Sequence, residues 1–264
     1  MLLAGRRVLV TGVLTEASLA SAVVRETRAR GAEVLLTSPV CRAHRVTSRL
    51  APRLGVDAPV LELDVELPDD LAALADAVRE AGWDGVDGVV HAIAYLGDRH
   101  REPQPDPHRG DAGFAGAPWD AVAPALQTAA WSMAAVVHAL RPLLTRGSSV
   151  VGLTLDPARA RAGADWLPVA RAGLAAVTRQ LARELGPAGV RVNLVASGPA
   201  RTMLSRALPE TEALVADWAE RAPLGWDADD RSAVARTVAA LLSDLLPATT
   251  GELVHADGGR HAVE

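Results

Sequence analysis

Short runs of apolar residues alternate with longer segments of helical apolar spacing along the whole chain. A run such as Val8–Val10 contains no polar residue, as expected for a strand buried on both faces. The intervening segments place an apolar residue every three or four positions, which predicts helices. Strands are expected at 8–10, 33–37, 59–63, 86–93, 148–153, 191–196 and 252–256, and helices from 18 onward and over 41–54, 69–82, 119–144, 166–185, 210–220 and 231–242. This alternation predicts a parallel sheet covered by helices on both faces.

The first strand, turn and helix form the unit around which the rest of the chain is organised. Val8–Val10 is followed by Thr11 and Gly12, and the apolar spacing turns helical from Ser18. Such a unit opens Rossmann-type doubly wound folds, in which the free N–H groups of the helix bind a pyrophosphate. Only one glycine of the G-x-G-x-x-G motif is in place, so an ordinary βα turn is the alternative. We predict an α/β fold of this type, as a single domain over residues 1–264.

Composition narrows the classes of function. The net charge is −5 with 22% charged residues, which argues against a nucleic-acid-binding or membrane-binding surface. The one cysteine, Cys41, fits a reducing compartment, and the sequence shows no signal peptide and no apolar run that spans a bilayer. We therefore expect a cytoplasmic protein. The chain has 27 arginines and no lysine, which excludes every mechanism that needs a lysine.

A polar segment at 96–117 follows the fourth expected strand, at the strand end where α/β folds bind their ligands. It contains His100 and His108, which titrate near neutral pH and are candidates for acid–base catalysis. A solvated loop without a catalytic role is the alternative. No spacing of histidine, cysteine and aspartate residues predicts a metal site.

Several motifs occur in the order and spacing of one enzyme family. They include Val10-Thr-Gly12, Leu63-Asp-Val65, Val90-His-Ala-Ile93, Pro223-Leu-Gly-Trp226, Leu246-Pro-Ala-Thr-Thr-Gly251 and Asp257-Gly-Gly259. Together they resemble the NADH-dependent enoyl-acyl-carrier-protein reductases of the mycobacterial type, a branch of the short-chain dehydrogenase/reductase family. The resemblance runs nearly end to end and implies an acyl-thioester or other small-molecule substrate.

The resemblance also implies that NAD binds along one edge of the sheet. The family's dinucleotide-binding positions correspond here to Gly12, Ser18, Leu19, Asp64, Val65, Ile93, Gly198, Pro199 and Thr202. Ala94 departs from the pattern, because the family has a glycine there and a methyl group crowds the passing cofactor.

The choice between NADH and NADPH stays open from the residues alone. The acidic residue that usually binds the ribose 2′-hydroxyl is missing from Thr37–Val40, after the second strand. Arg42 and Arg45 follow at positions suited to a 2′-phosphate, but solvated arginines on a helix are the alternative. The resemblance favours NADH.

The family's catalytic tyrosine and lysine positions are both substituted, by Ala164 and Arg171. Arg171 keeps the positive charge, and we expect it to donate to the hydroxyls of the nicotinamide ribose. Ala164 offers no donor to a substrate carbonyl, and loss of one such donor typically costs about 10²–10³ in rate. Tyr95 and His100 are the candidate replacements. An aromatic wall of the pocket is the alternative role for Tyr95.

Two functions therefore compete. One is an NADH-dependent reductase of an α,β-unsaturated thioester or another conjugated carbonyl, with a rebuilt proton-donor side. The other is a non-redox protein on the same scaffold, either a lyase, isomerase or cyclase or a pseudoenzyme subunit. The retained cofactor positions favour the first. The resemblance further implies a homotetramer, and the short segment between Thr202 and Ala222 predicts a smaller acyl pocket than in the mycobacterial relatives.

Overall fold

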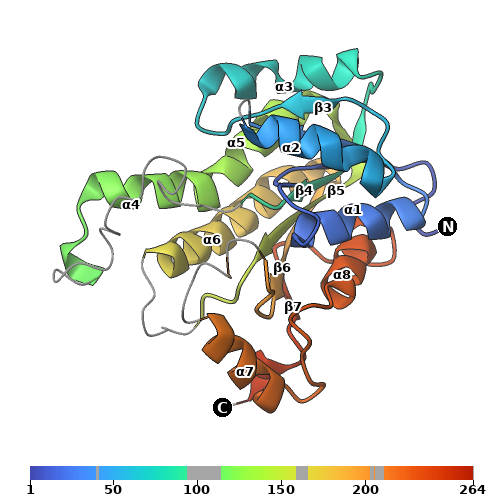
Figure 1. Cartoon of the computed structure of the whole chain (residues 1–264). Coiled ribbons are helices and arrows are strands. Elements are labelled where there is room, and N and C mark those ends of the chain that lie inside the picture. Colours follow the sequence, from blue (N-terminus) through green and yellow to red (C-terminus); the bar gives the residue numbers. More distant parts are fainter. Residues whose placement is uncertain (40–41, 94–113, 159–165, 203–204, 206–210, 264) are drawn as a thin grey trace.

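The computed structural model describes residues 1–39, 42–93, 114–158, 166–202, 205 and 211–263. Its strands are β1 (Arg7–Val10), β2 (Glu33–Ser38), β3 (Val60–Glu62), β4 (Val86–His91), β5 (Leu144–Thr154), β6 (Arg191–Ser197) and β7 (Leu253–Ala256). They form one parallel sheet in the order β3-β2-β1-β4-β5-β6-β7 (Figure 1). The order runs outward from β1 in both directions, which is the doubly wound arrangement. The predicted Rossmann-type α/β fold is confirmed.

Helices cover both faces of the sheet. One face carries α1 (Leu19–Ala29), α2 (Arg42–Leu50) and α8 (Ser232–Leu242), and the other carries α3 (Pro68–Glu80), α5 (Ser132–Leu140) and α6 (Leu167–Leu185). Strand side chains alternate between the two cores, since Val8 and Val10 pack on the first side and Leu9 on the second. Full burial of each such side chain contributes about 1.5–3 kcal/mol.

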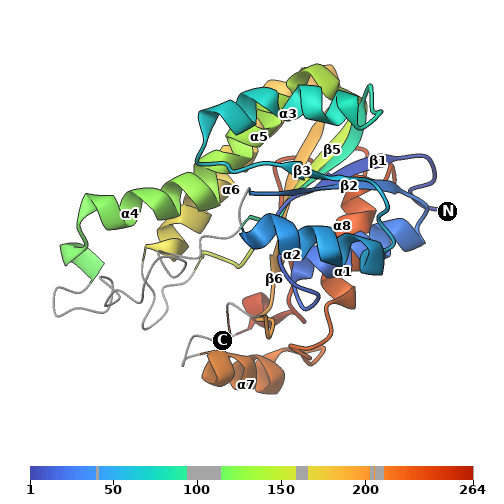
Figure 2. The same ribbon diagram turned by 45° about the horizontal axis from the view of Figure 1, so that its top comes forward.

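Two further helices extend beyond this layered core. They are α4 (Trp119–Leu126) and α7 (Thr211–Arg221). In Figures 1 and 2, α4 projects from one side of the molecule, and α7 lies past β7 beside the C-terminal end. No helix in the described part of the chain is both long enough and apolar enough to cross a membrane.

The prediction of one continuous helix over 119–144 was wrong, because this segment is divided into α4 and α5. A π-helical turn at Gln127–Trp131 separates α4 from α5, and a 3₁₀ turn at Arg141–Leu143 ends the segment. Pro124, inside α4, lacks the N–H that a regular helix requires. The N–H of Ser132 then bonds to Gln127 O, five residues back, as in a π-bulge.

Strand boundaries differ from the expectation at two places. β5 begins at Leu144 and not at Ser148, because Leu144 pairs with Val86 across an irregularity in the β4–β5 register. β4 ends at His91, two residues before the expected end at Ile93. The segment predicted as one helix at 41–54 is α2 followed by a 3₁₀ turn at Ala51–Leu54, while Cys41 lies outside the described residues.

Candidate functional site

The turn after β1 is fixed by its contact with the end of β4. Thr11 Oγ1 donates to Val90 O at 3.1 Å and accepts from the N–H of Ala92 at 3.1 Å. Gly12 has a φ of +75°, and a Cβ at this position would lie 2.1 Å from Ala92 O. Only glycine fits such a close approach of two backbones. The close approach of Gly12 to the backbone of Ala92 therefore requires a glycine, whether or not a ligand binds there.

The N-terminus of α1 also lies at the carboxyl ends of the strands. Ser18 is the N-cap, with extended backbone, and its Oγ accepts from the N–H of Ser21 at 3.1 Å. Leu19 is the first helical residue. Ser21 Oγ in turn donates to Thr15 O at 2.6 Å, which closes the loop between β1 and α1. The free amides of the first turn give this edge a positive partial charge.

The turn after β3 is ordered by two carboxylates. The N–H of Asp64 donates to Asp70 Oδ2 at 2.8 Å, and Asp64 Oδ1 accepts from the N–H of Glu66 at 2.9 Å. Val65 between them is buried. These bonds hold the Asp64 carboxylate at the carboxyl end of its strand.

The segment after β6 is held by two tryptophans. A Cβ on Gly198 would lie 2.6 Å from the ring of Trp226 and 2.8 Å from Trp218 Nε1, so glycine gives room for both rings. Trp226 Nε1 donates to Pro199 O at 2.7 Å. Thr202 closes the segment, since its Oγ1 accepts from the N–H of Ser205 at 3.1 Å. The Pro223–Trp226 motif thus supports the turn that follows β6.

Two further predicted residues are placed in other elements. Ile93 follows β4 and packs, partly buried, against the core on the α5–α6 side. Arg171 lies in the second turn of α6 and is partly exposed. Gly12 and Ile93 lie close together, because the Gly12 Cβ position is 3.1 Å from the N atom of Ile93. Tyr95, His100, Ala94 and Ala164 lie outside the described residues, so their predicted roles stay predictions.

His91, at the end of β4, is packed in the core. Its side chain is buried, and its Nε2 lies 2.8 Å from Ser132 Oγ. Ser132 Oγ donates its own proton to Thr128 O at 2.6 Å, so the histidine must be the donor to Ser132. Burial lowers the pKa of His91 from 6.5 to about 4. A neutral imidazole therefore links β4 to the π-helical turn.

A cluster of two histidines and two aspartates at the ends of β5 and β7 was missed by sequence reasoning. The rings of His255 and His261 stack with centroids 3.7 Å apart and an interplanar angle of 13°. Asp156 Oδ2 lies 3.3 Å from His255 Nε2, and Asp257 Oδ1 lies 3.0 Å from His261 Nδ1. The first contact is an ion-pair distance without hydrogen-bond alignment, since His255 Nε2 has no hydrogen-bond partner in the described structure.

One aspartate of this cluster, Asp257, is buried. Asp257 is 3% exposed and accepts from the N–H groups of Gly259 and His261, both at 3.0 Å. The signal that was available was His255 itself, a polar residue in a strand whose other residues are apolar. In the described ranges, no three histidine, cysteine, aspartate or glutamate side chains are grouped so as to hold a metal ion.

Comparison with known proteins identifies the family. Residues 12–261 match the family model described as enoyl-(acyl carrier protein) reductase. The enoyl-[acyl-carrier-protein] reductases [NADH] of Mycolicibacterium smegmatis and Mycobacterium avium are each 39% identical over 270 residues, covering 98% of this chain and 97% of the relative. The NADH enzyme of Bacillus cereus is 31% identical over 98% of both chains. A Staphylococcus aureus relative named for NADPH is 29% identical. The chain therefore belongs to the enoyl-(acyl carrier protein) reductase family, as its motifs predicted.

Proposed function

We propose that the protein is an NAD(H)-dependent oxidoreductase that reduces an enoyl thioester or a related conjugated carbonyl compound. The observation that carries this proposal is the ordered sheet edge in a chain similar from end to end to NADH-dependent enoyl reductases. The turn at Gly12 and the capped N-terminus of α1 lie together at the carboxyl ends of the strands. That is where doubly wound sheets bind dinucleotides.

The described residues fit a dinucleotide. The amides at the start of α1, beside Ser18 and Leu19, would hold the pyrophosphate, and no side chain at Gly12 would block its approach. Asp64 and Val65 would lie against the adenosine half, with Ile93 at the strand end between the halves. Gly198, Pro199 and Thr202 would flank the nicotinamide half, and Arg171 would donate to its ribose hydroxyls. When bound, NADH supplies the hydride.

The proton-donor side is the part of this proposal that departs from the family. With Ala164 at the tyrosine position, a carbonyl oxygen that gains negative charge needs another donor. Tyr95 and His100 are the residues we propose for that role. The same substitution supports the second function, a non-redox protein that uses the pocket for other chemistry or assembles as a pseudoenzyme subunit.

A two-step experiment tests the proposal. NADH is first titrated into the isolated protein by calorimetry, and NADH oxidation is then followed with a short enoyl thioester. Binding with turnover supports the reductase. Binding without turnover favours the non-redox function, and no response to millimolar NADH or NADPH removes both the cofactor and the reductase assignment.

We also propose a cytoplasmic homotetramer. The large apolar side chains on α4, the π-helical turn and α6 support assembly, because Trp119 is 71% exposed, Trp131 49% and Val169 39%. Large apolar side chains that are exposed in one subunit are candidates for burial in an interface.

A further inference from the structure

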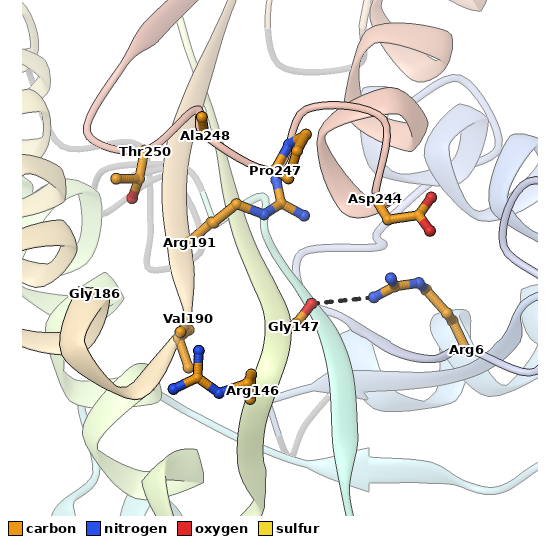
Figure 3. Close-up of a pocket in the computed structure, with 11 residues that line it drawn as sticks. Arg6, Arg146, Gly147, Gly186, Val190, Arg191, Asp244, Pro247, Ala248 and Thr250 are labelled. Atoms are coloured by element: carbon orange, nitrogen blue, oxygen red, sulfur yellow. Dashed lines mark hydrogen bonds between the residues drawn. The ribbon is translucent and has the colours of Figure 1, made fainter.

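A cavity of about 320 Å³ lies at the edge of the sheet opposite the proposed dinucleotide site. It is lined at the amino ends of three strands, by Arg6 just before β1, Arg146 near the start of β5 and Arg191 at the first position of β6 (Figure 3). Its size falls in the range of small-molecule sites, about 300–1,000 Å³. The cavity shares no lining residue with the carboxyl-end site.

The lining carries an excess of positive charge. The lining contains three arginines and one carboxylate, that of Asp244, which gives it a formal charge of +2. Gly147 and Gly189 also line the cavity, and glycine at 189 makes room for an arginine, since a Cβ there would lie 3.0 Å from Arg146 Cγ.

The innermost guanidinium is held rigidly. Arg191 is 8% exposed, and its two terminal nitrogens donate to Leu241 O at 2.8 Å and Ser243 O at 2.6 Å, at the end of α8. Arg6 donates to Gly147 O at 3.2 Å from the other side of the strand (Figure 3). Both arginines are therefore oriented in advance, and a ligand would not have to order them.

The positive charges act on one another. The pKa of Arg191 is lowered, first by burial and then by repulsion from Arg6, while Asp244 raises it. Arg6 and Arg191 repel each other, and the single carboxylate of Asp244 compensates only one of these charges. The remaining positive charge would attract an anion.

We propose that this cavity binds the dianionic phosphoryl group of a small molecule. A dianion matches the formal charge of +2, and the planar fork of arginine fits phosphate oxygens better than a point charge does. The lining also contains the apolar residues Val190, Pro247 and Ala248, which would suit a small organic substituent. This proposal does not depend on the dinucleotide site or on the reductase activity.

Titration calorimetry with inorganic phosphate and with glycerol phosphate tests the proposal, at constant ionic strength adjusted with sodium chloride. Saturable binding of one equivalent is expected. Arg6→Gln and Arg146→Gln should each weaken it about tenfold or more, because a charge-assisted hydrogen bond is lost. Asp244→Asn should tighten it, since the formal charge of the cavity rises. Tighter binding of glycerol phosphate assigns an ester, and tighter binding of inorganic phosphate assigns the free ion.

Arg53→Gln is the matched control, an exposed arginine outside the cavity lining. Equal phosphate affinity in the wild type and in the Arg6 and Arg146 variants would overturn the proposal, as would equal weakening by the Arg53 variant. Circular dichroism checks that each variant is folded. NADH binding, measured in parallel, should not change.

Discussion

At the scale of single residues, His91 connects burial to the dependence of stability on pH. Its pKa is lowered from 6.5 to about 4, so below pH 6.5 the unfolded chain takes up a proton that the folded chain refuses. The contribution of neutral His91 to the free energy of unfolding is therefore complete above pH 6.5 and is lost as the pH falls toward 4. At 1.36 kcal/mol per pKa unit, the loss between pH 7.5 and 4.5 is about 2–3 kcal/mol.

Urea unfolding at pH 7.5 and 4.5 measures this loss in the wild type and in His91→Gln, which keeps a donor near the position of Nε2. The variant should lose about 2–3 kcal/mol less across this interval. His138→Gln, on the exposed side of α5, is the control and should behave like the wild type. A pH dependence unchanged by His91→Gln would show that other groups titrate.

Ala164 offers no hydrogen-bond donor to a substrate carbonyl, so another residue must provide one. If the protein is a reductase, Tyr95→Phe or His100→Ala should lower the rate of NADH oxidation by about 10²-fold, as for loss of an oxyanion donor or a general acid. The rate with a short enoyl thioester is the measurement. Wild-type activity that neither substitution affects would exclude both residues as donors.

Restoring the family residues is the complementary experiment. Reductase activity that appears only in the double variant Ala164→Tyr, Arg171→Lys would show that the scaffold can still support the reaction and that the wild-type protein does not carry it out. In that case the non-redox function is favoured.

At the scale of elements, Thr11 joins β1 to β4. Its hydroxyl serves both Val90 O and the N–H of Ala92, and the side chain is fully buried. Thr11→Val keeps the shape and the bond from the Thr11 N–H to Val90 O, but it leaves the N–H of Ala92 without its partner, so the free energy of unfolding should fall by about 1–3 kcal/mol. NADH affinity should fall as well, because the turn at Gly12 is tied to the same strand ends. Thr237→Val on α8, whose hydroxyl bonds only its own helix at Ala233 O, is the control for denaturant unfolding.

The segment between β6 and α7 governs a prediction about substrate length. We expect the stretch from Thr202 to Ala222, which contains α7, to be shorter than in the mycobacterial relatives and so to wrap less of an acyl chain. Each methylene that stays in water forgoes about 0.8 kcal/mol of binding. The ratio kcat/KM, measured over enoyl thioesters of increasing length, should level off at short chains. A steady rise up to long chains would contradict the smaller pocket.

Local sequence patterns predicted most elements because buried strands and amphipathic helices leave periodic traces. The turn at Gly12 and the start of the helix near Ser18 were predicted for the same reason, since both are local features, whereas their contacts with a dinucleotide stay predictions. The early start of β5 left no such trace, because Leu144 pairs with Val86 far away in the sequence. The contact of Asp156 with His255 joins residues about 100 positions apart, which no local pattern encodes.

At the scale of the whole molecule, the exposed tryptophans predict assembly. Light scattering at micromolar concentration should report a tetramer. Replacing Trp119 and Trp131 together with glutamate should shift the mass downward, because buried charge without a partner is costly. Leu224→Glu is the control, a side chain that is 89% exposed on the loop after α7. A monomeric wild type would contradict the prediction.

The contact between Gly12 and the backbone of Ala92 bears on how the history of such proteins can be traced. Any other residue at 12 would place an atom 2.1 Å from a carbonyl oxygen, so selection for a folded chain is enough to keep the glycine. A descendant that had lost its reaction would retain it as faithfully as a working enzyme. Positions 164 and 171 are those at which this chain lacks the tyrosine and lysine of the family it belongs to. A survey that separates active enzymes from relatives that have lost the reaction should therefore compare positions 164 and 171. The glycine at position 12 does not distinguish the two groups.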